Sequence, residues 1–194
     1  MAKVVVFESV TLDGVMQAPG RPDEDRRGGF EHGGWATPYA DEAMGKLAAE
    51  GMATTGGLIL GRCTYESFHG YWPHQKDNPF TDVLNNTMKY VASRTLTEPL
   101  PWQNSTLLRP DVVTAVGELR KGSGGDVVVL GSGDLVQTLV RHGLVDEYML
   151  LLHPLMLGSG IRLFREGNPV TTLHLVDSTP TTTGVVINRY LSTS

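Results

Sequence analysis

The chain of 194 residues is long enough to bury a hydrophobic core without help from disulfides or metal. Hydrophobic residues make up 40% of the chain and charged residues 19%, a balance that excludes general disorder. A formal net charge of -5 gives no overall reason to bind nucleic acid.

The N-terminal part of the chain combines short buried strands, a long loop and a helix. Residues 4–7 (VVVF) form a run typical of a strand buried on both faces of a mainly parallel sheet. Residues 11–37 are rich in glycine and charge, which predicts a long loop of the kind that is usually functional or mobile. Apolar residues at helical spacing predict a helix over 41–52, followed by a second buried strand at 58–60.

The same alternation continues through the middle of the chain. Asp111 is a typical helix N-cap residue, and the three valines at 127–129 belong to the most strand-like segment. The expected helices are 63–68, 80–86, 112–121 and one from the glycine turn at 131–133 to His142, and the expected strands are 89–92, 106–108 and 126–130.

After Gly143 the alternation stops, and residues 146–153, 171–178 and 184–191 read as three longer strands separated by turns. These strands predict an antiparallel end to the sheet. The chain contains no internal repeat and no interdomain linker. We therefore predict one α/β domain over residues 1–194, with a mixed, mostly parallel central sheet, antiparallel C-terminal strands and helices on both faces.

Compartment and membrane contact follow from three local features. The single cysteine, Cys63, cannot form an intrachain disulfide and suits a reducing compartment. Glu8 ends the first apolar run after four residues, too soon for a signal-peptide core. No apolar stretch approaches the roughly 20 residues that a membrane span requires. We expect a soluble, cytoplasmic protein without a membrane partner.

Three turns after predicted parallel strands offer groups suited to phosphate. Gly131-Ser132-Gly133 combines small residues with the backbone amides of a helix N-terminus, although a tight connection without a ligand has the same pattern. Gly61-Arg62-Cys63-Thr64 adds a guanidinium and a hydroxyl, and Ser93-Arg94-Thr95 follows the next strand. Taken singly, each is also explained as a cap or a solvated charge. Together they can converge on one ligand with several phosphates, because carboxyl ends of parallel strands share one edge.

NADPH has the shape and charge that such an edge would accommodate. Arg62 and Arg94 favour NADPH over NADH, because a planar guanidinium binds the additional 2′-phosphate well. We therefore predict NADPH as the cofactor.

The order of the motifs resembles that in dihydrofolate-reductase-like proteins. The motifs are Ser9-Val10-Thr11-Leu12-Asp13-Gly14, Gly61-Arg62-Cys63-Thr64-Tyr65-Glu66 and Gly131-Ser132-Gly133-Asp134-Leu135. Later segments resemble the C-terminal reductase domain of riboflavin biosynthesis and its bacterial relatives, namely Gly143-Leu144-Val145-Asp146-Glu147, His153-Pro154 and Leu157-Gly158-Ser159-Gly160.

This resemblance, which covers nearly the whole chain, implies a dihydrofolate-reductase-like three-layer fold, an NADP(H) site built from the three turns, and a homodimer. It implies that Arg62 and Thr64 bind phosphates of the cofactor and that Ser93 lies near the 2′-phosphate. The cofactor-binding residues expected in full are Gly61, Arg62, Thr64, Ser93, Arg94, Thr95, Gly131, Ser132, Gly133 and Asp134.

Two departures from the family concern the substrate. The riboflavin reductases have a glutamate just before the glycine turn, where this chain has Leu130, which argues against 5-amino-6-(5-phosphoribosylamino)uracil reductase-like activity. Dihydrofolate reductases place an acidic residue in the helix before the second strand, and here only Asp41 and Glu42 lie near that stretch.

Hydride transfer to a C=N or C=O bond also needs a proton donor and a dry pocket. Our candidate donors are Asp13, Asp41 and Glu42, although Asp13-Gly14 is also a plain turn and the other two also suit a helix N-terminus. The expected walls of the substrate space are Met16, Trp35, Phe30 and Tyr65, with Trp72 as a weaker candidate, although aromatic residues are more often ordinary core.

The sequence predicts neither a metal site nor covalent catalysis. No histidine pair with a nearby acid has metal-ligand spacing, and Cys63 lacks a local histidine partner. The predicted function is reduction by NADPH of a pterin-like or other small heteroaromatic or carbonyl substrate. The alternative is a non-catalytic NADP(H)-binding protein of the same fold.

Overall fold

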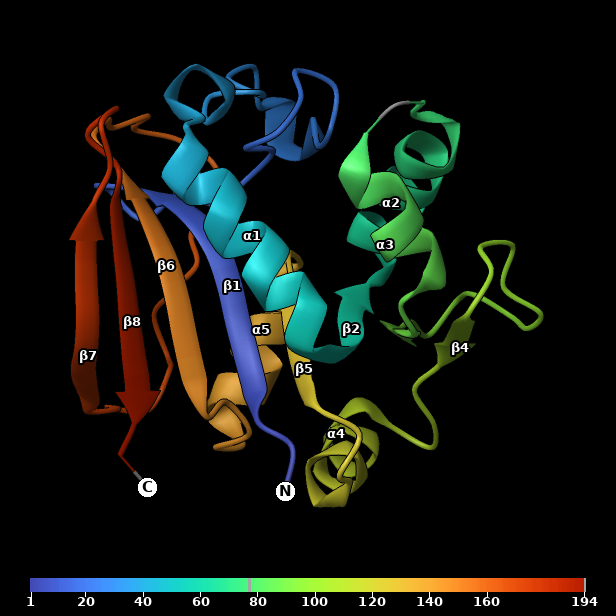
Figure 1. The fold of residues 1–194 in the computed structure, drawn as a ribbon. Coiled ribbons are helices and arrows are strands. Elements are labelled where there is room, and N and C mark those ends of the chain that lie inside the picture. The colour runs from blue at the N-terminus through green and yellow to red at the C-terminus, as the bar shows by residue number, and fades with distance from the viewer. Residues whose placement is uncertain (77, 194) are drawn as a thin grey trace.

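A computed structural model describes residues 1–76 and 78–193, and its centre is an eight-stranded sheet with the order β4-β3-β2-β5-β1-β6-β8-β7 (Figure 1). The strands are β1 (Val4–Thr11), β2 (Thr55–Gly61), β3 (Lys89–Ala92), β4 (Ser105–Leu107), β5 (Asp126–Leu130), β6 (Glu147–His153), β7 (Leu173–Pro180) and β8 (Val186–Ser192). The helices are α1 (Glu42–Thr54), α2 (Arg62–Tyr71), α3 (Pro79–Asn86), α4 (Val112–Lys121) and α5 (Gly133–Arg141), with short 3-10 turns at Arg27–Gly29, Thr37–Tyr39 and Trp72–His74.

The sheet is mixed, as the sequence predicted. The six strands from β4 to β6 run parallel, whereas β8 is antiparallel to both of its neighbours, β6 and β7. The strand β1 lies between β5 and β6, with Phe7 opposite both Leu130 and Met149. The carboxyl ends of β1, β2, β3 and β5 therefore lie along one edge.

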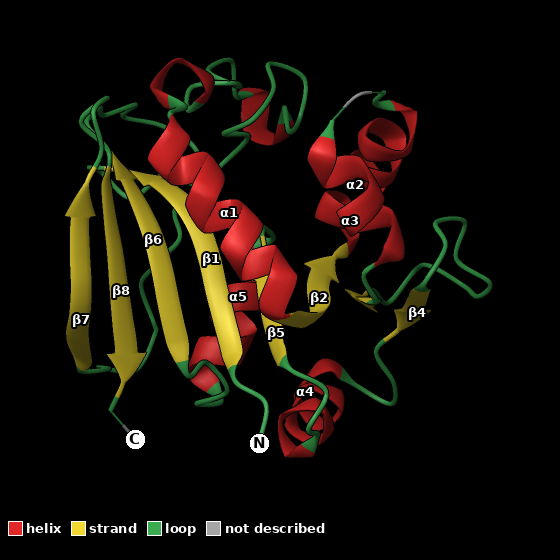
Figure 2. Cartoon of the chain, viewed as in Figure 1, coloured by secondary structure: helices red, strands yellow, loops and turns green. Residues whose placement is uncertain are grey.

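Helices cover both faces of the sheet (Figure 2). Burial alternates along β1, and Val4, Val6 and Val10 belong to the same core cluster as the buried residues of α4 and α5. Leu58 and Leu60 of β2 pack on the opposite face with residues of α2 and α3. This gives three layers, with α1, α2 and α3 on one face and α4 and α5 on the other.

Helix α1 covers its face loosely. Asp41 caps its N-terminus by accepting a hydrogen bond from the Met44 amide at 3.0 Å, yet none of its residues is buried. Between α1 and the sheet lies an apolar chamber with a volume of about 380 Å³. Among the described residues, no helix has the length and apolar character needed to cross a membrane.

Candidate functional site

A cleft of about 190 Å³ lies at the carboxyl edge of the sheet, where β1 and β5 end and α2 and α5 begin. Its floor and walls come from the strand ends, the glycine turn, the start of α2 and the long loop after β1. The lining residues are Phe7, Glu8, Ser9, Met16, Gln17, Ala18, Pro19, Glu24, Asp25, Arg27, Cys63, Thr64, Ser67, Phe68, Leu130, Gly131, Ser132, Gly133 and Ile161.

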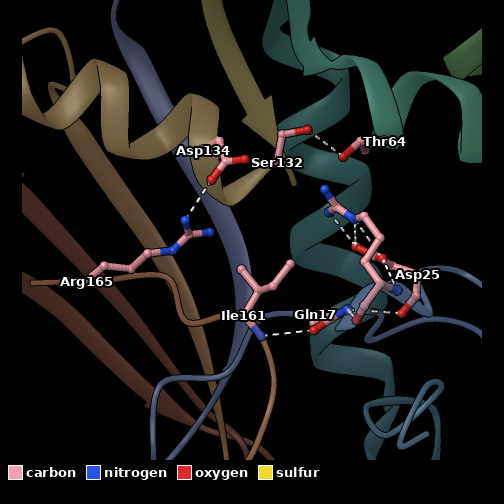
Figure 3. Close-up of polar contacts among 8 residues, drawn as sticks. Gln17, Asp25, Thr64, Ser132, Asp134, Ile161 and Arg165 are labelled. Atoms are coloured by element: carbon pink, nitrogen blue, oxygen red, sulfur yellow. Dashed lines mark hydrogen bonds and ion pairs between the residues drawn. The ribbon is translucent and has the colours of Figure 1, made fainter. Parts of the chain in front are cut away.

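The turns after β2 and β5 fit together so closely that they require small residues. The hydroxyls of Thr64 and Ser132 are hydrogen-bonded at 2.7 Å (Figure 3). A Cβ atom at Gly61 would lie only 2.2 Å from Ser132 Oγ, and one at Gly131 would lie 2.7 Å from Thr64 Oγ1. Gly131 also has a φ of +64°, which favours glycine. The backbone at this helix N-terminus is therefore open to an anion, whose charge the helix dipole favours.

Gln17 fixes the long loop that forms the opposite wall. Its amide nitrogen donates to the carbonyl oxygens of Asp25, at 3.2 Å, and Arg27, at 3.0 Å. Its amide oxygen accepts from the Ile161 amide at 2.9 Å, as Figure 3 shows. The Trp35 indole donates to the Gln17 carbonyl oxygen at 2.7 Å. One side chain, 4% exposed, thus joins the loop to a segment near residue 160.

Two ion pairs give the cleft its charge pattern. Asp25 and Arg27 are 2.6 Å apart; burial raises the pKa of Asp25, but hydrogen bonds from Arg27 outweigh it and leave that pKa below its usual value. Asp134 pairs with Arg165 at 2.6 Å beside the start of α5. Arg27 lines the cleft, and a Cβ at Gly133 would lie 2.8 Å from the guanidinium of Arg165. Both guanidinium groups are therefore near enough to the cleft to contact a phosphate there.

Glu8 is the most unusual group at the floor. It is 5% exposed, and its Oε1 has no hydrogen-bond partner within residues 1–76 and 78–193. Burial raises the pKa of Glu8 to about 8, the backbone amide of Gly131 opposes this in part, and the Glu24 carboxylate adds to it. The cleft therefore contains a carboxyl group that is largely neutral at pH 7.

The expected cofactor residues fall into two groups. Thr64, Gly131, Ser132 and Gly133 line the cleft together, and Gly61 supports them by packing on Ser132. The other expected residues do not line it, although they lie along the same edge. Arg62 pairs with Glu66 at 3.0 Å, Asp134 pairs with Arg165, and Ser93, Arg94 and Thr95 follow Ala92, the residue opposite Gly61 in the neighbouring strand.

Asp13 lies outside the cleft and joins two loops. Its carboxylate accepts hydrogen bonds from the Thr11 hydroxyl at 2.6 Å and from the amides of Leu157 and Gly158 at 3.2 and 2.8 Å. The Thr11 hydrogen bond contributes most to holding the pKa of Asp13 below its usual value. A carboxylate bound in this way is a poor proton donor at neutral pH.

We expect Asp13→Asn to lower the free energy of unfolding by about 1 to 2 kcal/mol, because the asparagine amide cannot accept from both loop amides. Denaturant unfolding at pH 7 measures the change. Glu42→Gln, which alters an exposed carboxylate in the first turn of α1, is the control and should leave the stability nearly unchanged. Equal stability of Asp13→Asn and wild type would contradict the joining role.

The remaining candidates are also placed by the structure. Asp41 caps α1 and accepts from the Thr182 amide and hydroxyl, each at 3.1 Å, and neither Asp41 nor Glu42 lines the cleft or the chamber. Of the expected substrate walls, Met16 lines the cleft. Trp35 and Tyr65 are 7% and 1% exposed and line neither space, because Trp35 packs within the loop and Tyr65 packs on Trp102.

The apolar chamber under α1 adjoins the cleft, and Phe7, Phe68 and Leu130 line both spaces. Trp72, a weaker candidate from the sequence, lies in the chamber wall, and its buried Nε1 donor has no partner among the described residues. Within the same residues no three His, Cys, Asp or Glu side chains are grouped so that they could hold a metal ion.

Sequence reasoning missed Glu8, Gln17 and Arg27. For Glu8 a signal existed: residues 4, 6, 8 and 10 lie on the same face of a strand that continues to Thr11, so the period of two places Glu8 beside buried valines. The hydrogen bond between Gln17 and Ile161 joins residues 144 positions apart, for which the sequence offers no local signal.

Comparison with known proteins agrees with this geometry. The model of the RibD C-terminal domain family matches residues 2–187. The uncharacterized protein YyaP of Bacillus subtilis is 30% identical over 134 residues, which cover 66% of this chain and 70% of YyaP.

Two solved structures have the same fold. A putative riboflavin biosynthesis protein from Shewanella sp. PV-4 superposes with a TM-score of 0.72 at 21% identity, covering 100% of both chains. Dihydrofolate reductase from Enterococcus faecalis, complexed with NADP(H), superposes with a TM-score of 0.59 at 14% identity, covering 99% of this chain and 97% of that one. The resemblance inferred from the motifs is confirmed, and so is the dihydrofolate-reductase-like fold.

Proposed function

Since the chain belongs to the RibD C-terminal domain family, we propose that it is an NADPH-dependent reductase of a small heteroaromatic or carbonyl substrate. The observation that supports this most is the junction of two unlike spaces. A polar cleft with a glycine turn and a helix N-terminus opens beside an apolar chamber, and both share Phe7, Phe68 and Leu130.

The polar cleft suits the dinucleotide. Members of this family typically bind NADP(H). The amides at Gly131, Ser132 and Gly133, with the Thr64 hydroxyl, would hold the phosphates, and a side chain at Gly61 or Gly131 would collide with Ser132 or Thr64 and displace these groups. Arg62 and Arg94, at the same edge, would select the 2′-phosphate.

The apolar chamber suits the hydride acceptor. NADPH, when bound, supplies the hydride, and this chain supplies a dry space next to it. The chamber is walled by aromatic and thioether side chains, on which flat rings stack well. The unpartnered Trp72 Nε1 offers a hydrogen bond to a carbonyl or ring nitrogen of the substrate.

The alternative, a non-catalytic NADP(H)-binding protein, is favoured by one observation. Asp13, Asp41 and Glu42, the acids expected to give a proton, line neither the cleft nor the chamber. Both functions require cofactor binding, so oxidation of NADPH with a panel of carbonyl and heteroaromatic acceptors separates them. The homodimer and the cytoplasmic location stay predictions.

The primary test is a titration with NADPH and NADH followed by quenching of the three tryptophans. We expect tighter binding of NADPH than of NADH, and we expect Arg62→Ala to weaken NADPH binding by about 1.5 to 3 kcal/mol, as for a charged hydrogen bond. Arg141→Ala, at the far end of α5 and exposed, is the matched loss of a positive charge and should bind as wild type does. Failure of both nucleotides to bind, with an unchanged melting temperature, would exclude the proposed function.

A further inference from the structure

Glu8 occupies a position that the proposed reductase activity does not by itself explain. It lies on the face of β1 that carries Val4, Val6 and Val10, which pack beneath α5. The preceding residue, Phe7, is opposite Leu130 of β5. Glu8 is therefore level with Gly131, the residue that opens the turn into α5. A carboxyl group thus lies buried at the floor of the cleft, beside the helix N-terminus.

The acidic surroundings of Glu8 do not favour its ionisation. Glu24 and Asp25 of the long loop face the same cleft, and Arg27, its cationic group, is already paired with Asp25 at 2.6 Å. Burial and Glu24 together raise the pKa of Glu8 to about 8, against the opposing contribution of the Gly131 amide.

Two further elements bring titratable or charged groups to the cleft. At the start of α5, Arg165 lies beside Gly133, but its guanidinium is bound to Asp134 at 2.6 Å. The start of α2 contributes the Cys63 thiol. Neither gives Glu8 a partner, since its Oε1 has no hydrogen bond within the residues that the structure describes.

The charge of Glu8 decides what can occupy the start of α5. An ionised Glu8 would itself attract the free amides of the helix N-terminus and repel a phosphate there. A neutral Glu8 leaves those amides available and has a proton to donate to a phosphate or other acceptor oxygen. Binding of an anion and protonation of Glu8 therefore favour each other.

We propose that Glu8 is a cofactor-binding residue in the form of a neutral carboxylic acid, which donates a hydrogen bond to the bound dinucleotide and makes its affinity depend on pH. This rests on the proposed function, because it requires that the cleft binds NADPH. The three turns at 61–64, 93–95 and 131–133 do not provide this role.

The experiment measures the dissociation constant of NADPH by tryptophan quenching from about pH 7 to about pH 9.5, a range in which the ligand's own 2′-phosphate stays ionised. If only the neutral form binds, wild-type affinity should fall about 30-fold across this range. Glu8→Gln, which keeps the shape and a donor without the charge, should bind with nearly constant affinity. Circular dichroism verifies that the variant is folded.

Two further variants identify the titrating group. Cys63 lines the same cleft, so Cys63→Ser should retain the full pH dependence if Glu8 is responsible. Glu24→Gln should shift the transition to lower pH, because it removes a charge that disfavours ionisation of Glu8. The glutamine oxygen can still accept from the amides of Gly20 and Arg21, to which Glu24 is bound.

The outcomes separate this proposal from the proposed function. Constant wild-type affinity, an unchanged pH dependence in Glu8→Gln, or its loss in Cys63→Ser would each overturn the role of Glu8 while NADPH binding itself stands. Absence of NADPH binding at every pH would instead refute the proposed function. A pH dependence that disappears only with Glu8→Gln, and shifts with Glu24→Gln, would establish the role.

Discussion

Replacing Gly131 with alanine should weaken NADPH binding by at least about tenfold and destabilise the protein by about 2 kcal/mol or more. At a φ of +64° alanine is strained, and its Cβ would lie 2.7 Å from Thr64 Oγ1 and 3.0 Å from Thr64 Cγ2. Relief of this contact must displace the glycine turn or the start of α2. Either movement would misplace the amides that we propose to hold the phosphates. The same quenching titration and denaturant unfolding measure both effects.

Gly143 offers a closely matched control. Its φ is +61°, almost that of Gly131, but a Cβ added there would meet nothing within 4 Å. The strain of the positive φ should therefore destabilise Gly143→Ala by only about 1 kcal/mol, and this variant should bind NADPH as wild type does. Similar binding by the two variants would show that the close packing on Thr64 has no part in forming the site.

The second large effect concerns stability. Glu8→Gln should be more stable than wild type in alkaline solution. The folded protein raises the pKa of Glu8 from 4.5 to about 8, so the unfolded chain gives up this proton more readily. The contribution of Glu8 to stability is complete below about pH 4.5 and is lost as the pH rises toward about 8. Between about pH 5 and pH 8 wild type should lose about 3 kcal/mol relative to Glu8→Gln.

Thermal unfolding of both proteins across this range measures the difference, which corresponds to about 6 to 12 °C in melting temperature. Glu147→Gln is the control of opposite sign. Glu147 is also buried, but it accepts hydrogen bonds from Arg189 at 3.1 Å and from Lys3 at 3.2 Å. Burial raises the pKa of Glu147, but these two partners outweigh burial and hold that pKa below its usual value. Its substitution should destabilise the protein near pH 7 and less so in acid. Parallel pH profiles for wild type and Glu8→Gln would contradict a neutral Glu8.

The fold was predictable from local patterns because its elements have strong ones. The segments 89–92, 112–121 and 126–130 are strands and a helix with the bounds expected, and Asp111 caps α4 by accepting from the Thr114 amide at 3.0 Å. The glycine turns were recognisable because glycine and a positive φ belong together, as at Gly131.

The candidate site was harder to predict because its decisive contacts are distant in sequence. Asp13 looks like a turn residue, and its partners Leu157 and Gly158 follow 144 and 145 positions later. Gln17 reads as a residue of the long loop, yet its amide oxygen accepts from the backbone amide of Ile161, 144 positions later. Such contacts depend on how the elements pack, which local propensity does not determine.

The position of β1 inside the sheet sets the order in which a growing chain can complete its structure. This first strand pairs with β5 and β6, which begin at Asp126 and Glu147, so both of its edges stay open while the intervening residues are synthesised. The wall that Gln17 fixes forms later still, because the Gln17 side chain accepts a hydrogen bond from the Ile161 amide and Ile161 must first leave the ribosome. The cleft is thus among the last parts to form, and a nascent chain that ends before Ile161 does not yet have it.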